Sequence, residues 1–322
     1  MLTAPDFSKK QIVFVMTSEG EKLAISNSNL VVKKPDGSIK FQITCYRLFL
    51  VFVVGHCSIT TVLIREAIKF GFFIALMTPS FRLYSMVGAE KAGNTLLHRK
   101  QYSYEGLDLA KHITINKVSN QLAELKSIRN KSNYTKEAIC TLTTYTDNIS
   151  KAATLNEIMA YEGLASKMYF RNHFNNVEWK GRQPRIKRDY VNSALDIGYS
   201  ILFTYIDAIV SSYGFDTYCG VMHRQFYMRK SLICDLVEPF RPIVDHVVKT
   251  AINLKQISED DFIQINYQYR LKWEMSSKYA KLFMMPLIEE KEMIFQYIQS
   301  YYRAFMKELP GKDFPCYEYR EK

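Results

Sequence analysis

The first quarter of the chain alternates short apolar and polar stretches in the manner of β-strands. Its segments are rich in β-branched and aromatic residues, and turn sequences such as Pro35-Asp36-Gly37 separate them. A helix is predicted over Thr60–Phe70, with Gly71 as its stop, and a buried strand follows over Phe72–Met77. The other predicted strands are Gln11–Met16, Lys22–Ser26, Leu30–Val32, Ile39–Thr44 and Leu48–Val54.

From about Ala89 onward the apolar residues recur at three- and four-residue spacing, which is typical of amphipathic helices. This change of period predicts an α+β protein. A small β-rich N-terminal domain, residues 1–88, would be followed by a larger all-α C-terminal domain, residues 89–322. The predicted helices are Leu96–Ser119, Asn120–Lys131, Ala153–Phe174, Val191–Tyr213, Ser231–Leu254 and Asp260–Phe305, the last broken once or twice.

Composition places the chain among globular proteins with an anionic partner. Hydrophobic residues make up 48% of its 322 residues, which excludes a disordered tail. The net charge of +11 indicates a polyanion, with nucleic acid as the leading candidate and a membrane surface as a further one. The alternative is that the charge serves solubility only.

The cysteines and the apolar runs argue for a soluble intracellular protein. No Cys-x-x-Cys pair occurs, so neither a zinc ribbon nor a disulfide framework is predicted, and a reducing cytoplasm fits best. Met1–Lys10 is polar and is not a signal peptide. Leu48–Val54 is too short to span a bilayer.

The segment Trp179–Arg188 interrupts the helical pattern and carries no acidic residue. A basic loop of this kind can follow a phosphate backbone, since each contact adds affinity that does not depend on base sequence. The alternative is a solvated surface loop. Its basic residues are Lys180, Arg182, Arg185, Lys187 and Arg188.

Glu162 stands alone in an apolar helical face. Leu155, Ile158, Ala165 and Tyr169 share that face at helical spacing. An unpaired carboxylate there would be costly unless it bound a metal or another cation. The alternatives are that Glu162 borders solvent or pairs with a lysine.

A second group of polar residues follows Gly220. His223 lies in a predicted loop, and Asp235 and Glu238 lie three residues apart on a predicted helix with Ser231 as its N-cap. An imidazole and acidic oxygens suit a cation such as Mg²⁺ or Mn²⁺. The alternatives are a structural histidine and two acids on a solvated face.

Two prolines bear on the direction of these acids. Pro239 and Pro242 cannot donate to the carbonyls of Asp235 and Glu238, four residues back, so a regular helix is interrupted here. Our hypothesis is a bend that re-aims the two acids. A straight helix with both acids in solvent would contradict it.

Fragments in this order resemble the CRISPR-associated integrase of spacer acquisition, over most of the chain. In the front part they are Gly55–Thr61, Leu63–Ala67 with Gly71, and Asn94–Tyr102. In the rear part they are Glu162–Ala165, Tyr169-Phe170, Asn192–Leu195, Gly198-Tyr199, Gly214–Asp216, Gly220, His223 and Ser231–Asp245. Asp196 and Ile197 depart from the family pattern, which more often has Ser and an aromatic residue.

The resemblance implies a β-rich dimerisation domain and a helical catalytic domain that carries the metal site. It implies Glu162, His223 and Glu238 as ligands of Mg²⁺ or Mn²⁺, with Asp235 as an assisting catalytic neighbour. Arg241 and Asp245 match family positions, and Arg241 is assigned to DNA. It also implies a homodimer that assembles with a small ferredoxin-like subunit.

The implied reaction is a metal-dependent transesterification in the cytoplasm of a prokaryote. The 3′-hydroxyl of a short double-stranded DNA, the prespacer, attacks a phosphodiester at the repeat boundary of a CRISPR array. A metal-dependent endonuclease on branched DNA and a catalytically inactive DNA-binding scaffold are the alternatives. The basic loop and the lysine-rich helices between Lys111 and Lys136 would hold the DNA without reading its bases.

Reversing the charge at Arg182 and Arg185 tests the loop. We expect weaker DNA binding and a flatter salt dependence, because a protein that contacts fewer phosphates releases fewer counterions when it binds. A binding titration at several salt concentrations measures both quantities. Unchanged affinity throughout would exclude the loop as a DNA contact.

Overall fold

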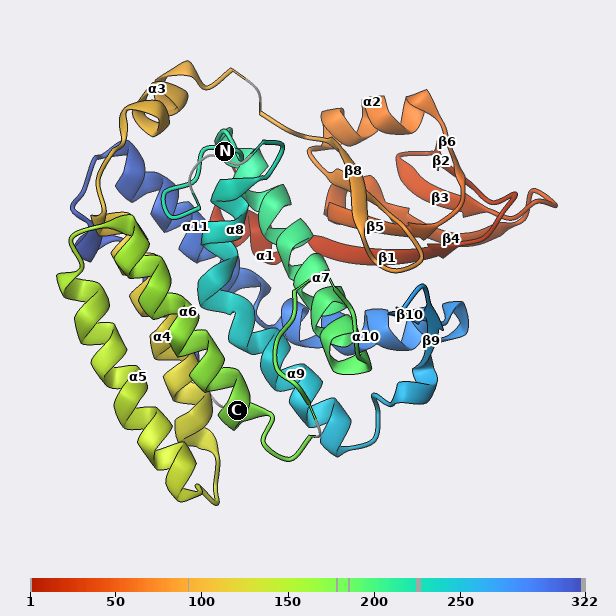
Figure 1. Ribbon diagram of the computed structural model, residues 1–322. Coiled ribbons are helices and arrows are strands. Elements are labelled where there is room, and N and C mark those ends of the chain that lie inside the picture. The colour runs from red at the N-terminus through yellow and green to blue at the C-terminus, as the bar shows by residue number, and fades with distance from the viewer. Residues whose placement is uncertain (1, 92, 178, 185, 224–226, 320–322) are drawn as a thin grey trace. The chain divides into compact units, whose positions relative to one another are not determined.

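The computed structural model describes residues 2–91, 93–177, 179–184, 186–223 and 227–319 (Figure 1). The chain folds into two compact units. The first, here called the sheet unit, comprises residues 1–94, 200–215 and 271–295. The second, the helical unit, comprises residues 95–199, 216–270 and 296–322. The β-rich start and the helical remainder confirm the predicted α+β class.

The described part of the sheet unit contains two four-stranded sheets. In the first, β1-β5-β7-β8, the strands β1, β5 and β7 are parallel and β8 is antiparallel to β7. The second has the order β4-β3-β2-β6. Val51 of the first sheet and Leu23 of the second share one apolar core with Leu63. The strands are β1 (Gln11–Thr17), β2 (Lys22–Ser26), β3 (Asn29–Lys33), β4 (Ile39–Thr44), β5 (Leu48–Gly55), β6 (Ser58–Ile59), β7 (Phe73–Met77) and β8 (Leu83–Gly88).

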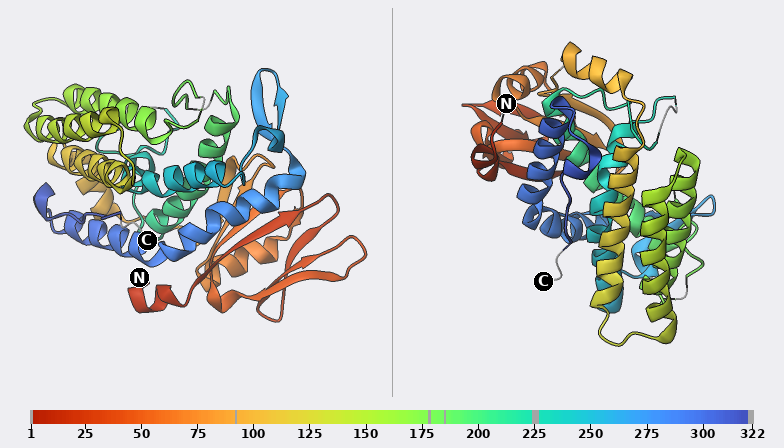
Figure 2. Two further views of the ribbon diagram at one scale, coloured as in Figure 1. Left: turned by 90° about the horizontal axis from the view of Figure 1, so that it is seen from below. Right: turned by 90° about the vertical axis from the view of Figure 1, so that its left-hand side faces the viewer.

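Helices form most of the rest of the described chain. Within the helical unit, α4, α5 and α6 run side by side, as both views of Figure 2 show. The helices are α1 (Ala4–Ser8), α2 (Thr61–Phe70), α3 (Thr95–Ser103), α4 (Asp108–Ser127), α5 (Asn133–Lys151), α6 (Leu155–His173), α7 (Tyr190–Tyr213), α8 (Ser231–Val237), α9 (Arg241–Asn253), α10 (Ser276–Glu289) and α11 (Lys291–Met306).

Strand β5 explains why the sheet unit takes in two remote segments. All eight of its residues are buried, so both faces of the sheet need apolar cover, as in other parallel sheets. Phe49 of β5 contacts Tyr205 of α7, with ring centroids 6.4 Å apart. Phe7 stacks on Phe295 of α11 at 4.0 Å. A domain boundary placed at residue 88 from periodicity treats the two domains as consecutive segments. Cover for the sheet comes also from residues 200–215 and 271–295.

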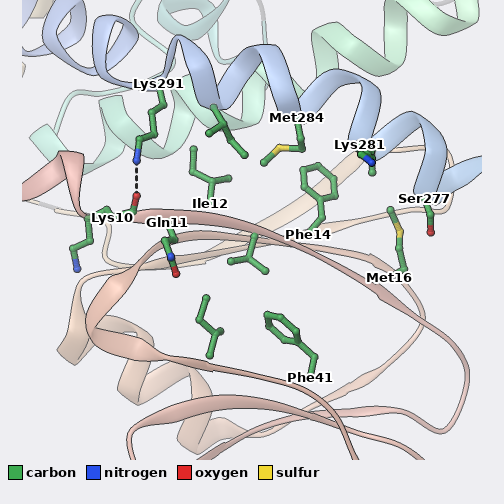
Figure 3. A pocket seen from close by; sticks show the side chains of 14 residues that line it. Lys10, Gln11, Ile12, Phe14, Met16, Phe41, Ser277, Lys281, Met284 and Lys291 are labelled. Atoms are coloured by element: carbon green, nitrogen blue, oxygen red, sulfur yellow. Dashed lines mark hydrogen bonds between the residues drawn. The ribbon is translucent and has the colours of Figure 1, made fainter. Parts of the chain in front are cut away.

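A cavity of about 720 Å³ lies beside β1 in the sheet unit (Figure 3). Residues of β1, β4, α10 and α11 line it, among them Phe14, Phe41 and Met284. At one end, Lys291 Nζ donates a hydrogen bond of 2.9 Å to the carbonyl oxygen of Lys10. This bond ties the start of α11 to the segment before β1.

The predicted division of the first long helical region was wrong. A break separates α3 from α4 at residues 104–107, and α4 then runs past Ser119 to Ser127. Asp108 at the start of α4 accepts a hydrogen bond of 2.8 Å from the backbone N–H of Gly311, which is about two hundred residues away in sequence. This long-range contact helps fix the start of α4, and local periodicity does not report it.

Helix α5 was missed because threonine has a low helix propensity. Ser132 caps it by accepting a hydrogen bond of 3.1 Å from the N–H of Thr135. Along the helix, Thr141 and Thr143 donate to the carbonyls four residues earlier, each at 2.9 Å. These bonds satisfy the hydroxyls within the helix, so the threonine-rich sequence remains helical.

The prediction of helix from Asp260 was also wrong. Residues 262–271 form a hairpin of β9 (Phe262–Ile265) and β10 (Gln268–Leu271) before α10 begins. Asn266 and Tyr267 at its tip have φ values of 50° and 61°, as a two-residue type I′ turn requires. The alternation of apolar and polar residues over Ile263–Leu271 was the available signal for strands.

Helix α7 is long and apolar enough to cross a membrane by length and composition, with a mean hydropathy of 1.3 over its most apolar window. Of that window, 83% is buried within the structure. A core helix of a folded protein has the same properties, so α7 is weak evidence for a membrane span.

A polar cluster lies inside the helical unit. The imidazole of His173 is fully buried and stacks on the ring of Tyr169 at 5.0 Å. Burial lowers the pKa of His173 to about 4, although Glu124 at 3.6 Å acts in the opposite direction. Burial also raises the pKa of Asp245, which accepts a hydrogen bond from Tyr199, to about 7. Between about pH 4 and 6.5 the two groups therefore change stability in opposite directions.

Replacing His173 with Phe isolates its contribution. Between a folded pKa of about 4 and an ordinary value of 6.5, the unfolded chain binds the proton that folded His173 does not. The free energy of unfolding of the wild type, relative to His173→Phe, should therefore rise with pH across this interval by up to about 3 kcal/mol. Urea unfolding at several pH values measures it.

Because the measurement is a difference, the opposing effect of Asp245 cancels. The control for the loss of an imidazole as such is His56→Phe, because His56 is exposed. Parallel stability curves for wild type and His173→Phe would contradict the assignment.

Candidate active site

The chain bends where the two prolines predict it. Helix α8 ends at Val237, a 3-10 turn covers Glu238–Phe240, and α9 begins at Arg241. Asp235 is fully buried and Glu238 is 3% exposed, so neither acid faces solvent. These observations confirm the hypothesis of a bend. The predicted N-cap was wrong, because Lys230 precedes the helix and Ser231 is its first residue.

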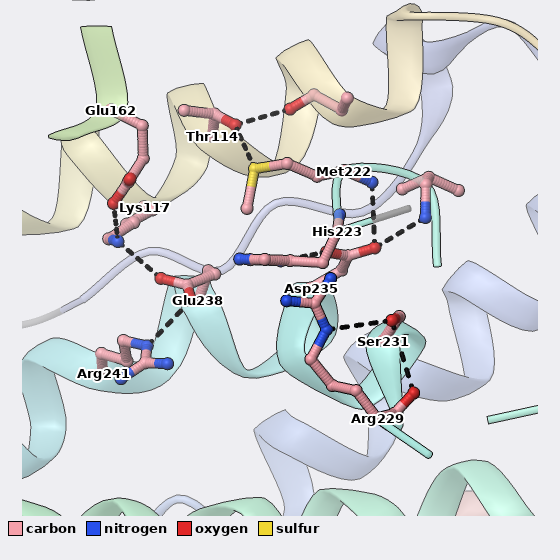
Figure 4. A network of polar contacts seen from close by, with 12 residues as sticks. Thr114, Lys117, Glu162, Met222, His223, Arg229, Ser231, Asp235, Glu238 and Arg241 are labelled. Atoms are coloured by element: carbon pink, nitrogen blue, oxygen red, sulfur yellow. Dashed lines mark hydrogen bonds and ion pairs between the residues drawn. The ribbon is translucent and has the colours of Figure 1, made fainter. Parts of the chain in front are cut away.

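The carboxylate of Asp235 organises the loop that carries His223 (Figure 4). Its Oδ2 accepts hydrogen bonds from the backbone N–H groups of Val221 and Met222 at 2.6 and 3.0 Å. Its Oδ1 accepts from the backbone N–H of His223 at 3.0 Å and lies 2.6 Å from Nδ1 of that imidazole. A Cβ at Gly220 would lie 2.8 Å from Oδ2, so only glycine allows this approach. Asp235 therefore acts on the position of His223.

His223 is consequently fixed in one orientation. The contact with Asp235 places the proton on Nδ1 and leaves Nε2 as the basic nitrogen. No described residue forms a hydrogen bond with Nε2. In Figure 4 the ring extends toward Glu238, and His223 contributes to lowering the pKa of that carboxyl. An imidazole held in this way can bind a cation or move a proton.

Lys117 of α4 joins the other two predicted ligands (Figure 4). Its Nζ forms a hydrogen-bonded ion pair with Oε1 of Glu162 on α6 and lies 2.6 Å from Oε2 of Glu238. Ser166 donates a second hydrogen bond to Glu162 Oε1 at 2.8 Å. Arg241 Nε lies 3.0 Å from the other oxygen of Glu238. Glu162 and Glu238 are thus brought together around one ammonium group.

Ion pairing keeps Glu238 and Lys117 charged despite their burial. Burial alone would raise the pKa of Glu238, but Arg241 and Lys117 outweigh it and hold that pKa at about 2. Burial alone would lower the pKa of Lys117, but Glu162 and Glu238 raise it above its ordinary value. Lys117 and Glu238 thus form a buried ion pair, and the half-buried Glu162 and Arg241 extend it at either end.

The donor set suits a hard divalent cation, but Lys117 is placed between two of its members. Two carboxylates and an imidazole are ligands that Mg²⁺ and Mn²⁺ accept. Within the described residues, however, no group of three or more His, Cys, Asp or Glu side chains is arranged to hold a metal ion. The point where Glu162 and Glu238 converge holds a positive charge that belongs to the protein itself.

Sequence reasoning did not single out Lys117. The alternative interpretation of Glu162, that it pairs with a lysine, is the contact that the structure contains. A signal was available, because Lys117, Asn120, Gln121 and Glu124 recur at helical spacing, and all four are buried. Polar residues at core spacing indicate a buried polar network.

Arg241 and Arg182 share one aromatic ring. The Arg241 guanidinium lies 4.6 Å from the ring centroid of Tyr199, and the Arg182 guanidinium lies 5.2 Å from the same centroid. Arg182 also forms an ion pair of 2.6 Å with Asp196 and donates to Asn192 at 3.0 Å. Its side chain is 12% exposed, so it helps to position the basic loop against α7.

The other basic residues of the loop differ in exposure. Lys180 and Arg188 are exposed, and Lys187 is half-buried with its carbonyl accepting a hydrogen bond of 2.8 Å from the N–H of Tyr269. Arg185 lies outside the described residues. The assignment of these side chains to DNA stays a prediction.

A second cavity, of about 630 Å³, begins beside Glu162 at Gly163 and Ser166. Lys167, Arg171 and Lys180 line it and are exposed. Aromatic side chains complete the wall: Phe170, Phe174 and Trp179. Cations beside aromatic faces are the combination that holds single-stranded nucleic acid.

A comparison with known families decides what kind of protein carries this site. The model of the family described as CRISPR associated protein Cas1 matches residues 14–284. The chain belongs to the Cas1 family. The resemblance seen in the sequence motifs is therefore confirmed.

Individual relatives agree with the Cas1 assignment. The CRISPR-associated endonuclease Cas1 1 of Francisella tularensis subsp. novicida is 28% identical over 284 residues, which cover 84% of this chain and 87% of that protein. A casposase bound to integration product has the same fold, with a TM-score of 0.77 at 20% identity, and 96% and 94% of the two chains are covered. A chain of a Cas6-RT-Cas1–Cas2 complex gives 0.82 at 22% identity, covering 97% of this chain and 36% of that longer one.

Replacing Asp235 with Asn tests its part in the loop before α8. The amide nitrogen of Asn cannot accept the hydrogen bonds that the carboxylate accepts, so backbone donors lose a partner. We expect the free energy of unfolding to fall by about 2–3 kcal/mol, measured by urea denaturation. The matched control is Asp147→Asn, at an exposed position of α5, which should change the free energy of unfolding by less than about 0.5 kcal/mol. Equal stability of the two variants would contradict the role of Asp235.

Proposed function

We propose that this Cas1-family chain is the integrase of CRISPR spacer acquisition and acts by a metal-dependent transesterification. The observation that carries the proposal is the convergence of Glu162 and Glu238 on one cationic position, with His223 held in a fixed orientation nearby. The family membership and the fold shared with a casposase bound to integration product support it.

Glu162, Glu238 and Nε2 of His223 would hold Mg²⁺ or Mn²⁺. The metal, when bound, would acidify the attacking hydroxyl and offset charge that develops on the phosphate. Asp235 keeps His223 in the tautomer whose Nε2 can bind a cation or take a proton. Arg241 stays beside Glu238 and keeps that carboxyl ionised.

The substrate in this proposal is double-stranded DNA, both as the prespacer and as the CRISPR repeat. The net charge of +11 favours such a polyanion. Lys167, Arg171 and Lys180 would contact phosphates in the cavity beside Glu162. A DNA end lying there would reach the carboxylates, because Ser166 both lines the cavity and bonds to Glu162.

The assembly is part of the same proposal. We infer a homodimer, formed through the β-rich part of the chain, that binds a small ferredoxin-like subunit in a prokaryotic cytoplasm. The support is the family and a structural relative solved as a Cas6-RT-Cas1–Cas2 complex.

Glu162→Gln tests the reaction. The strand-transfer assay uses a labelled short duplex, a plasmid bearing a CRISPR repeat, and Mn²⁺ or EDTA, with the small subunit added. We expect metal-dependent joined product from the wild type and at least about a hundredfold less from Glu162→Gln, because one metal-binding oxygen is lost. Glu157→Gln, an exposed acid on the same helix, is the matched control and should keep full activity.

The products distinguish the alternatives. An endonuclease, as the Cas1 relative of Francisella tularensis subsp. novicida is named, would leave hydrolysed ends on branched DNA and no joined product. If the protein is a scaffold, the wild type and Glu162→Gln would bind DNA equally well, and neither would react.

A further inference from the structure

Lys117 is a lysine without access to bulk water. Its side chain is 7% exposed, whereas lysine is almost never buried unless it is paired. Its ammonium reaches Glu162 and Glu238, two side chains from segments 76 residues apart in sequence. A surface lysine that folded over by chance would not make both contacts.

The fold places Lys117 there through its neighbours on α4. One turn further along, Asn120 Nδ2 donates 2.9 Å hydrogen bonds to the carbonyl oxygens of Pro239 and Tyr317. Asn116 Nδ2 donates to the carbonyl of Tyr317 at 2.7 Å. These bonds fix α4 against the 3-10 turn that begins at Glu238, so the ammonium position is built into the unit.

Without this ammonium, the two acids would lack a shared positive charge. Two carboxylates that converge in a poorly solvated site repel each other unless a positive charge lies between them. Arg241 serves Glu238 from its other oxygen and has no recorded contact with Glu162. Among the described contacts, Lys117 is thus the charge that holds the pair of acids together.

We propose that Lys117 is an internal counter-cation, which holds Glu162 and Glu238 together until a divalent metal replaces its ammonium between them. The inference rests on the metal site of the proposed function. A divalent metal held by both carboxylates would need the position that the Lys117 ammonium occupies between them, and two cations do not share one position. Metal binding must therefore break the two ion pairs of Lys117.

The proposal predicts an effect of unusual sign. Removing a positive charge from a DNA-binding enzyme ordinarily weakens its binding to DNA. Here the substitution Lys117→Met, which removes the ammonium but keeps an unbranched stem, should strengthen the binding of Mn²⁺ by about tenfold, the lower end of effects seen when a partner of a metal ligand changes. The matched control is Lys126→Met, an exposed lysine on the same helix, which should leave Mn²⁺ affinity unchanged.

Mn²⁺ binding is measured without DNA, by the loss of the electron paramagnetic resonance signal of free Mn²⁺, on the full chain. Glu162→Gln is included and should weaken binding. If Glu162→Gln binds Mn²⁺ as the wild type does, the metal site of the proposed function fails. If Glu162→Gln weakens binding but Lys117→Met does not strengthen it, the metal site stands and the counter-cation role of Lys117 is overturned.

Thermal unfolding gives a second readout. In EDTA, Lys117→Met should melt several degrees below the wild type, and Mn²⁺ should raise its melting temperature more than it raises that of the wild type. The double variant Lys117→Met/Glu162→Gln should recover part of the loss in EDTA, because the repulsion between the acids is gone. The double variant tests the proposal even if Lys117→Met folds only with Mn²⁺. A double variant that is less stable than either single variant would overturn it.

Discussion

Burial of carboxylates governs the architecture of the helical unit. A carboxylate removed from water stays ionised only when hydrogen bonds or positive charges replace its hydration. Asp235 meets this requirement with backbone N–H groups and an imidazole, and Glu238 meets it with Lys117 and Arg241. The partners of the two carboxylates come from different segments of the chain. The loop at His223, helix α4 and the start of α9 are therefore positioned by the charges that they neutralise.

The two modes of neutralisation suit different tasks. Asp235 is saturated by donors that belong to the backbone, so its oxygens are committed to the fold and to the orientation of His223. Glu162 and Glu238 are instead paired with side chains: both with the ammonium of Lys117 on its four-carbon stem, and Glu238 also with Arg241. In the proposed metal site, the two ligands Glu162 and Glu238 are therefore held by side chains. Asp235, which supports His223, is held mainly by the backbone.

Local chemistry made much of this structure predictable. The strands up to Met77 except β6 and the cap of α2 at Gly71 follow from β-branched runs and turn residues. Pro239 and Pro242 predicted the interruption of the helix beside the two buried acids. Apart from the hairpin of β9 and β10, whose alternation was visible in the sequence, the missed features named above depend on distant partners or on side chains that bond within their own helix. Neither the start of α4, held by Gly311, nor the contact of Lys117 with both acids has a local signature. Family motifs pointed to the carboxylates and the histidine but not to the cation between the acids.

The discontinuity of the two units has a consequence for biosynthesis. Segments as late as residue 295 belong to the sheet unit, and β5 is buried partly by side chains from them. The N-terminal strands therefore leave the ribosome well before their complete cover exists, and their apolar faces wait through the synthesis of some two hundred further residues. Parallel strands that form early but are covered late are prone to pair with other nascent chains. Efficient production of this protein in cells should therefore depend on chaperones that shield the first ninety residues during translation.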